Sequence, residues 1–122
     1  MKINKAGVRG EIYAARYLRD NGYKIVTGNF HSRLGEIDII AQKGKYMCFV
    51  EVKTRGQNSL YEAKEAVDLS KQAKIAATAK LFMKAYPNDS QPRFDVCEIY
   101  LDDDFKQTEI NYIENAFAPR ED

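Results

Sequence analysis

Several residue types that build common metal and redox sites are scarce or absent. The chain of 122 residues has no tryptophan, one histidine and two cysteines, Cys48 and Cys97, with no CxxC pair. A zinc site made of thiolates and imidazoles is therefore not expected. Because each cysteine stands alone inside an apolar run, we expect both to be small buried hydrophobic residues.

Long apolar runs and an excess of one charge are also missing. No run approaches the roughly 18 residues that a membrane-spanning helix needs. The first residues, MKINKAGVRGEIYAARYL, carry a glutamate where a signal peptide would have its apolar centre, so we expect a cytoplasmic protein with no membrane partner. With a net charge of +1, nucleic-acid binding would have to come from a local patch rather than from global charge.

What is present indicates one globular domain over residues 1–122, since 44% of the residues are hydrophobic and 30% are charged. Helical spacing predicts one helix over residues 4–21 and another from a cap at Asp68 to about Tyr86. Strand patterns occupy residues 23–29, 37–43, 46–54, 93–101 and 107–113. The polar tail from about residue 114 is expected to be mobile.

This order of elements predicts an α/β protein with a single mixed β-sheet flanked by helices. The first three strands have short connections and should form an antiparallel meander. The second helix is long enough to serve as a parallel crossover to the fourth strand, and the fifth strand should lie at an edge.

The most informative stretch is residues 35–55, GEIDIIAQKGKYMCFVEVKTR, which combines two apolar strands with four charged residues. Gly44-Lys45 fits a two-residue type II′ turn. In that register Asp38 lies opposite Glu51. Glu36 then lies opposite Lys53, with all four side chains on one face. Facing carboxylates repel each other unless one stays protonated or a cation lies between them, and oxygen donors of this kind suit Mg²⁺ or Mn²⁺.

A structural explanation of the same acids stays open. Glu36 and Lys53 could form an ordinary cross-strand ion pair, while Asp38 could be solvated on an exposed sheet face. That explanation accounts less well for two acids facing each other beside Ile40 and Phe49. We therefore favour a functional site.

These residues also have the form of a known family. Asp38, followed thirteen positions later by Glu51-Val52-Lys53, resembles the D…(D/E)xK signature of the restriction-endonuclease-like nuclease superfamily. The runs RGEIYAARYLRDNGYKIV, NFHSRLGEIDIIA, FVEVKTR, EAVDLSKQAKI and PRFDV resemble the YraN family of predicted endonucleases, which is similar to archaeal Holliday-junction resolvases. The resemblance extends from about Gly10 to Val96. It implies an αβββαβ core and metal-dependent cleavage of a phosphodiester in DNA or RNA.

The resemblance also implies roles for individual residues. Asp38 and Glu51 would be metal ligands, with the Val52 carbonyl as a neutral third ligand and Mg²⁺ or Mn²⁺ as the metal. Lys53 would orient the attacking water or stabilise charge on the phosphoryl group. Glu11 resembles a first-helix glutamate that borders the metal site, although it could equally reach water at the edge of the helix.

Further candidates surround these acids. Gln72 heads the apolar stripe of the second helix, near enough to its N-terminus to help bind phosphate, or else it is a solvated first-turn residue. Arg33, Arg55 and Lys71 are candidates for nucleic-acid binding. Asp95 is expected to form an internal structural ion pair, with Arg33 or Arg55 as possible partners, rather than to take part in catalysis.

The sequence thus predicts a metal-dependent endonuclease acting on DNA, including branched or other non-standard DNA. A resolvase-like role would favour a homodimer, because two strands must be cut together. The alternatives are a non-catalytic nucleic-acid-binding or adaptor protein that keeps the fold, and an interaction domain whose acids only form ion pairs.

Overall fold

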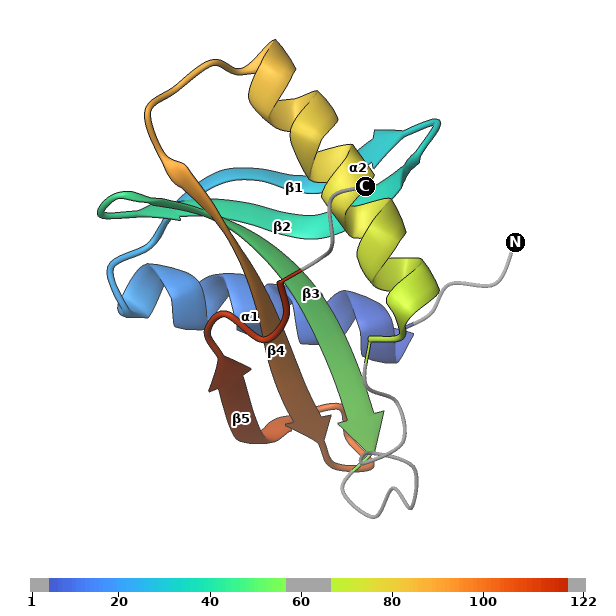
Figure 1. The fold of residues 1–122 in the computed structure, drawn as a ribbon. Helices are drawn as coiled ribbons and strands as arrows, with labels where there is room; N and C mark the ends of the chain where they lie inside the picture. The colour runs from blue at the N-terminus through green and yellow to red at the C-terminus, as the bar shows by residue number, and fades with distance from the viewer. Residues whose placement is uncertain (1–4, 57–66, 119–122) are drawn as a thin grey trace.

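The computed structural model describes residues 5–56 and 67–118, which form one sheet and two helices (Figure 1). The elements follow the chain as α1 (Lys5–Asp20), β1 (Lys24–Ser32), β2 (Gly35–Lys43), β3 (Tyr46–Gly56), α2 (Leu69–Ala85), β4 (Gln91–Leu101) and β5 (Gln107–Ile113). Every predicted element is therefore present, and β1 to β4 are longer than the sequence patterns indicated. Residues 60–67, for which the sequence pattern does not decide between loop and helix, fall almost wholly outside the described residues; Lys64, a further basic residue that could line a groove around the acids, is among those outside.

The five strands form a single sheet in the order β1-β2-β3-β4-β5. β1, β2 and β3 make the predicted antiparallel meander, β3 and β4 are parallel, and β5 pairs antiparallel with β4 at the edge. α2 lies in the connection between the two parallel strands. The predicted mixed α/β architecture is confirmed, and its αβββαβ order is consistent with a restriction-endonuclease-like core.

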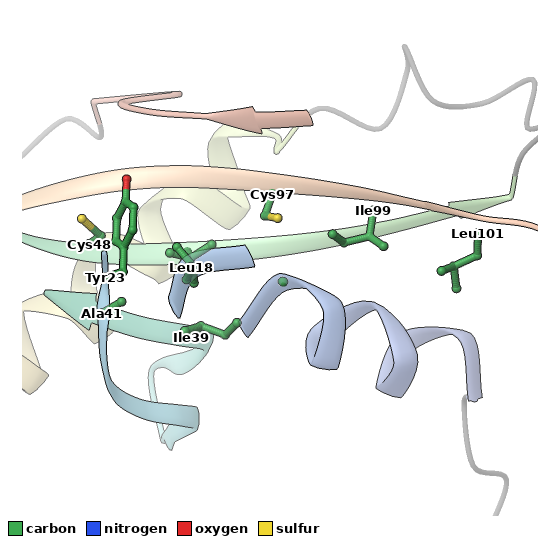
Figure 2. Packing of buried hydrophobic residues seen from close by; sticks show 10 residues of the cluster. Leu18, Tyr23, Ile39, Ala41, Cys48, Cys97, Ile99 and Leu101 are labelled. Atoms are coloured by element: carbon green, nitrogen blue, oxygen red, sulfur yellow. The ribbon is translucent and has the colours of Figure 1, made fainter. Parts of the chain in front are cut away.

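The two helices cover opposite faces of the sheet (Figure 1). Ala14 and Leu18 of α1 pack against a face that includes Cys48 and Val50 of β3 (Figure 2). α2 packs against the alternate residues of β3, among them Phe49. Successive residues of the central strand are therefore buried on both sides, as alternation along a strand requires. These opposing layers hold β3 rigidly in the middle of the molecule.

Two details of the core bear on the predictions from sequence. Cys48 and Cys97 are free and buried, as expected. Regular alternation along β2 would place Ile37 on the same face as Ile39 and Ala41, but it packs in the α2-side cluster instead. Neither of the two helices in the described part of the chain is long and apolar enough to cross a bilayer.

The second helix begins as its sequence predicts. The side chain of Asp68 accepts a hydrogen bond of 2.8 Å from the backbone N–H of Lys71, which is the N-terminal cap. Gln72 donates from Nε2 to the carbonyl of Val67 at 2.8 Å. The first turn of α2 is thus held by two side chains, and this fixes the backbone from which Lys71 extends.

Asp95 lies fully buried at the centre of a polar network on β4. Its carboxylate accepts hydrogen bonds from Arg93, from the hydroxyl of Tyr112 at 2.6 Å and from the backbone of Asn115 at 2.9 Å. The predicted structural ion pair exists, but its partner is Arg93. Arg33 and Arg55 are not involved: Arg33 is exposed on the turn after β1 and Arg55 pairs with Glu98.

The first residues of the tail contact the sheet. The backbone N–H of Ala116 donates to the carbonyl of Phe94 at 2.7 Å, and the ring of Phe117 stacks on that of Phe94 with centroids 5.5 Å apart. Whether the tail is mobile in solution stays a prediction, and residues 119–122 lie outside the described residues.

Candidate active site

The β2–β3 hairpin has the predicted turn, and its register is the predicted one as far as the two strands are paired. Gly44 has a φ of +56°, which suits the first position of a type II′ turn, and glycine adopts it without strain. The paired residues run from Lys43–Tyr46 to Ile39–Val50. Beyond that pair the backbone ladder stops, and Asp38 and Glu51 follow directly on the two strands.

A polar cleft of about 310 Å³ lies at this open end of the hairpin. Residues from the start of α1, from β2, from the end of β3 and from the first turn of α2 line it. Among the residues that the structure describes, its charged lining residues are Glu11, Glu36, Asp38, Glu51, Lys53 and Lys71. Four acids and two lysines, separated by up to 60 positions in sequence, therefore meet in one small volume.

Asp38 is an acid of the cleft whose pKa is raised by its surroundings. Its Oδ2 accepts a hydrogen bond of 2.8 Å from the backbone N–H of Val52. Burial, followed by the negative charge of Glu51, raises the pKa of the Asp38 carboxyl from 3.8 to about 6, although the Val52 hydrogen bond opposes the rise. Asp38 and Glu51 thus repel each other electrostatically, as the predicted register required.

Glu51 is buried, with 7% of its surface exposed, and is held by an ion pair. Its Oε1 lies 2.6 Å from Nζ of Lys71. Burial lowers the pKa of Lys71, but the hydrogen bond and charge of Glu51 outweigh that effect, so the pKa stays above its usual value. The ammonium of Lys71 is therefore the cation closest to Glu51 among the described ion pairs of the cleft.

Glu11 reaches the cleft from α1. Burial raises the pKa of its carboxyl, a hydrogen bond to Asn29 lowers it, and the charges of Glu36 and Glu51 raise it again. The helix can approach β3 closely because Gly10 has no side chain: a Cβ there would lie 2.0 Å from Oγ1 of Thr54. The sequence left open whether Glu11 borders the acids or reaches water at the edge of the helix, and in the structure it borders the acids.

The predicted pairing of Glu36 with Lys53 is not formed, although both residues line the cleft. Glu36 lies beside His31 of β1 in the sheet, and Nδ1 of His31 is 3.0 Å from its Oε2. The hairpin ladder ends at Ile39–Val50, so positions 36 and 53 are not paired across it. β1 runs to Ser32, past the predicted end at residue 29, which brings His31 alongside Glu36.

The remaining candidates lie around the cleft rather than in it. Gln72 is not among the described residues that line the cleft, and its amide is bound to Val67. Arg33 lines a neighbouring hollow that shares Glu36 with the cleft. Arg55 is buried, with its guanidinium 3.1 Å from Oε2 of Glu98, at a hollow on the other side. Lys71 is the only one of the three basic candidates that lines the cleft itself.

The donors of the cleft fit a hard divalent cation in their chemistry. Within residues 5–56 and 67–118, no three Asp, Glu, His or Cys side chains are grouped so as to hold a metal ion by themselves. Asp38 and Glu51 supply two carboxylates, and the Val52 carbonyl faces the same edge of β3 as the N–H that binds Asp38. Mg²⁺ and Mn²⁺ accept such a small oxygen set because water completes their coordination.

A comparison with protein families shows the family of the chain. Residues 10–99 match the model of Uncharacterised protein family UPF0102. The chain belongs to UPF0102. This confirms the resemblance to the YraN family, because YraN proteins are the members of UPF0102.

Relatives of the same family align over nearly their whole length. A UPF0102 protein of Acetivibrio thermocellus is 44% identical over 95% of both chains. One of Caldanaerobacter subterraneus subsp. tengcongensis is 43% identical over 95% of this chain and 98% of its own, and one of Clostridium perfringens is 41% identical over 95% and 97%. These names establish the family and state no activity.

Two features of this UPF0102 site were missed by the sequence. Glu36 was treated as a partner of Lys53 and not as a site residue, although its alternation with Asp38 already put both on one face. Lys71 was expected to bind nucleic acid, and its contact with Glu51 was not expected. No local pattern indicates that contact, because it joins residues 20 positions apart across segment 57–66.

Proposed function

We propose that this UPF0102 protein is a metal-dependent nuclease that hydrolyses phosphodiester bonds, with DNA as its substrate rather than RNA. The observation that carries the proposal is that Asp38 and Glu51 meet in one polar cleft, where burial and the charge of Glu51 raise the pKa of the Asp38 carboxyl to about 6. Two acids are held close enough to repel each other in a cleft that Lys53 also lines. Such an arrangement is costly for a fold unless a cation is to be bound there.

In this proposal Asp38, Glu51 and the Val52 carbonyl hold Mg²⁺ or Mn²⁺. When bound, the cation would neutralise charge on the phosphate and lower the pKa of an attacking water. Asp38 is already oriented by the Val52 N–H, and Glu51 is oriented by the rigid central strand. The two carboxylates therefore need little reorganisation to act as ligands.

Lys53 and Glu11 act beside the ligands. The ammonium of Lys53 lies in the same cleft and would stabilise the negative charge that develops on the phosphoryl oxygens. Glu11 has a raised pKa, so its carboxyl takes up a proton more readily than an ordinary glutamate and can serve as a base toward water. Both roles use groups that already line the cleft.

The hollow on one side of the cleft supports nucleic acid as the substrate. The hollow that Arg33 lines adjoins the cleft, because Glu36 lines both. A strand lying along both would meet Arg33 with one phosphate while another phosphate lies at the acids. On the opposite side Asp102 and Asp103 line the hollow and would repel a phosphate backbone. The proposed strand path therefore leaves the cleft toward Arg33.

The test is a cleavage panel. Labelled branched, flapped, duplex and single-stranded DNA and matched RNA are incubated with the protein in Mg²⁺, in Mn²⁺ and in a chelator, and the products are separated by size. The proposal requires metal-dependent products on at least one DNA substrate, and preferred cleavage of branched DNA would support the resolvase-like form. Size-exclusion chromatography of the same samples tests the homodimer that such a form needs.

One observation favours a second function, a non-catalytic nucleic-acid-binding or adaptor protein. Lys71 already neutralises Glu51 at 2.6 Å, so the acids have a cation without any metal. In that case the protein binds DNA, cleaves nothing under any metal, and binds equally well with and without Mg²⁺. The same panel, run with a gel-shift measurement, separates the two functions.

A further inference from the structure

We infer that Lys71 is a built-in competitor for the divalent cation: its ammonium occupies the cation-binding side of Glu51 and must leave before the metal is bound. This inference rests on the proposed function, because it assigns Asp38 and Glu51 to a metal. It goes further because it identifies the Lys71 ammonium as the cation of the metal-free site. It also predicts how metal and substrate help each other to bind.

The geometry of Glu51 supports this competition. The side chain of Glu51 is 8% exposed, so few approaches to its carboxylate remain open, and one is taken by Nζ of Lys71 at 2.6 Å from Oε1. An ammonium that close repels a divalent cation at the same carboxylate. The Lys71 ammonium and a divalent cation therefore cannot both bind Glu51 fully, and each weakens the binding of the other.

The mobility that this exchange needs belongs to the side chain alone. The backbone of Lys71 is fixed, since its N–H donates to the cap Asp68 and Gln72 binds Val67 beside it. The Lys71 side chain is 45% exposed, against 8% for that of Glu51. Lys71 can therefore rotate away from Glu51 toward solvent while α2 stays in place, at a cost that water largely offsets.

A released Lys71 still lines the cleft, where a phosphate would attract it. A nucleic-acid phosphate that draws Lys71 from Glu51 frees the carboxylate for the metal, and a metal that displaces Lys71 frees the ammonium for the phosphate. By linkage the two ligands then strengthen each other's binding by the same factor. Lys71 thereby prevents the acids from holding a metal tightly until the substrate is present.

The experiment compares Lys71→Met with Lys74→Met, which removes the same charge one turn later from an exposed position that does not line the cleft. Mn²⁺ is titrated calorimetrically into each protein, and thermal unfolding is followed with and without Mn²⁺. Lys71→Met should bind Mn²⁺ at least about tenfold more tightly than the wild type. Its metal-free form should melt at a lower temperature, because the repulsion between Asp38 and Glu51 is no longer offset. Lys74→Met should match the wild type in both respects.

Two results would overturn the inference. Unchanged Mn²⁺ affinity in Lys71→Met means that Lys71 does not compete, and equal tightening in both variants means that only long-range charge matters. If Lys71→Met fails to fold, Lys71→Gln takes its place with the same expectations. Failure of the proposed function looks different, since neither the wild type nor either variant would then bind Mn²⁺. Binding and cleavage with no effect of Lys71→Met would remove this inference alone.

Discussion

Asp38 and Val52 are joined by a hydrogen bond of 2.8 Å, in which the backbone N–H of Val52 donates to Oδ2 of Asp38. The bond lies just past Ile39–Val50, the last backbone pair of the hairpin, so a side chain replaces the backbone acceptor there. It orients the carboxylate beside the Val52 carbonyl, since both main-chain groups of one strand residue face the same edge. Two of the three proposed ligands are thus in position in the metal-free fold.

The first prediction concerns Asp38 and pH. Protonation of Asp38 stabilises the fold fully below its unfolded pKa of 3.8, and this stability is lost as the pH rises through about 6. Asp38→Asn removes the charge, and its amide oxygen can still accept the Val52 N–H. The metal-free variant should therefore exceed the wild type at pH 7 by up to about 3 kcal/mol and should lose most of that advantage near pH 4.

Urea unfolding at a series of pH values measures this difference. The control is Glu109→Gln, which removes an exposed carboxylate of β5 away from the cleft and should follow the wild type at every pH. The free energies of unfolding of Asp38→Asn and the wild type could instead differ by the same amount at every pH, or the wild type could be the more stable at pH 7. Either result would show that the charge on Asp38 does not destabilise the fold.

The second prediction separates catalysis from binding at Lys53. Lys53→Ala should abolish cleavage, because the charge that stabilises the phosphoryl oxygens is lost. Mn²⁺ affinity should stay near normal or become tighter, and DNA affinity at fixed salt should fall only modestly, because one phosphate contact among several is removed. Lys84→Ala, at the exposed end of α2, is the matched charge control. Unchanged cleavage in Lys53→Ala would rule out this role.

The third prediction is that Asp95 is structural. Asp95→Ala leaves the half-buried Arg93 and Tyr112 without their buried acceptor, and removal of one partner of such a network costs roughly 3–5 kcal/mol. Chemical denaturation should show that loss, while the variant that remains folded at low temperature should bind Mn²⁺ like the wild type. Weaker Mn²⁺ binding at unchanged stability would instead assign Asp95 to the site.

The fourth prediction tests how α1 is held against β3. A Cβ at position 10 would lie 2.0 Å from Oγ1 of Thr54, so Gly10→Ala should destabilise the fold by about 1–3 kcal/mol. Thr54→Ala makes room, and the double variant should therefore be less destabilised than the sum of the two single variants. A double-mutant cycle from urea melts measures this coupling. Strict additivity would mean that the two residues are not in contact.

The hairpin shows how much of the structure can be predicted from short stretches of sequence. A two-residue turn at Gly44 and alternation along each strand together fix every pair up to the open end, so the proximity of Asp38 and Glu51 follows from residues within one short stretch. The capped start of α2 was predictable for the same reason, because Asp68 and the N–H it accepts lie within one turn. Features of this kind need no knowledge of the rest of the chain.

Contacts between elements that are far apart in sequence could not be predicted in this way. Arg55 was expected to bind nucleic acid, and its ion pair with Glu98 of the parallel neighbour β4 was not expected. The register of parallel strands depends on the crossover between them and not on a turn, so the sequence gives no rule for it. The Lys71–Glu51 ion pair depends on the position of α2 for the same reason. Local patterns therefore could not predict the partner of either Arg55 or Lys71.

The central claim is that Asp38 and Glu51 form a divalent-cation site, and calorimetric titration of Mn²⁺ into the wild type and into Asp38→Asn tests it most directly. The account predicts saturable binding to the wild type that Asp38→Asn weakens at least about tenfold, with both proteins folded. Absence of binding to the wild type, or equal binding to the two proteins, would contradict it.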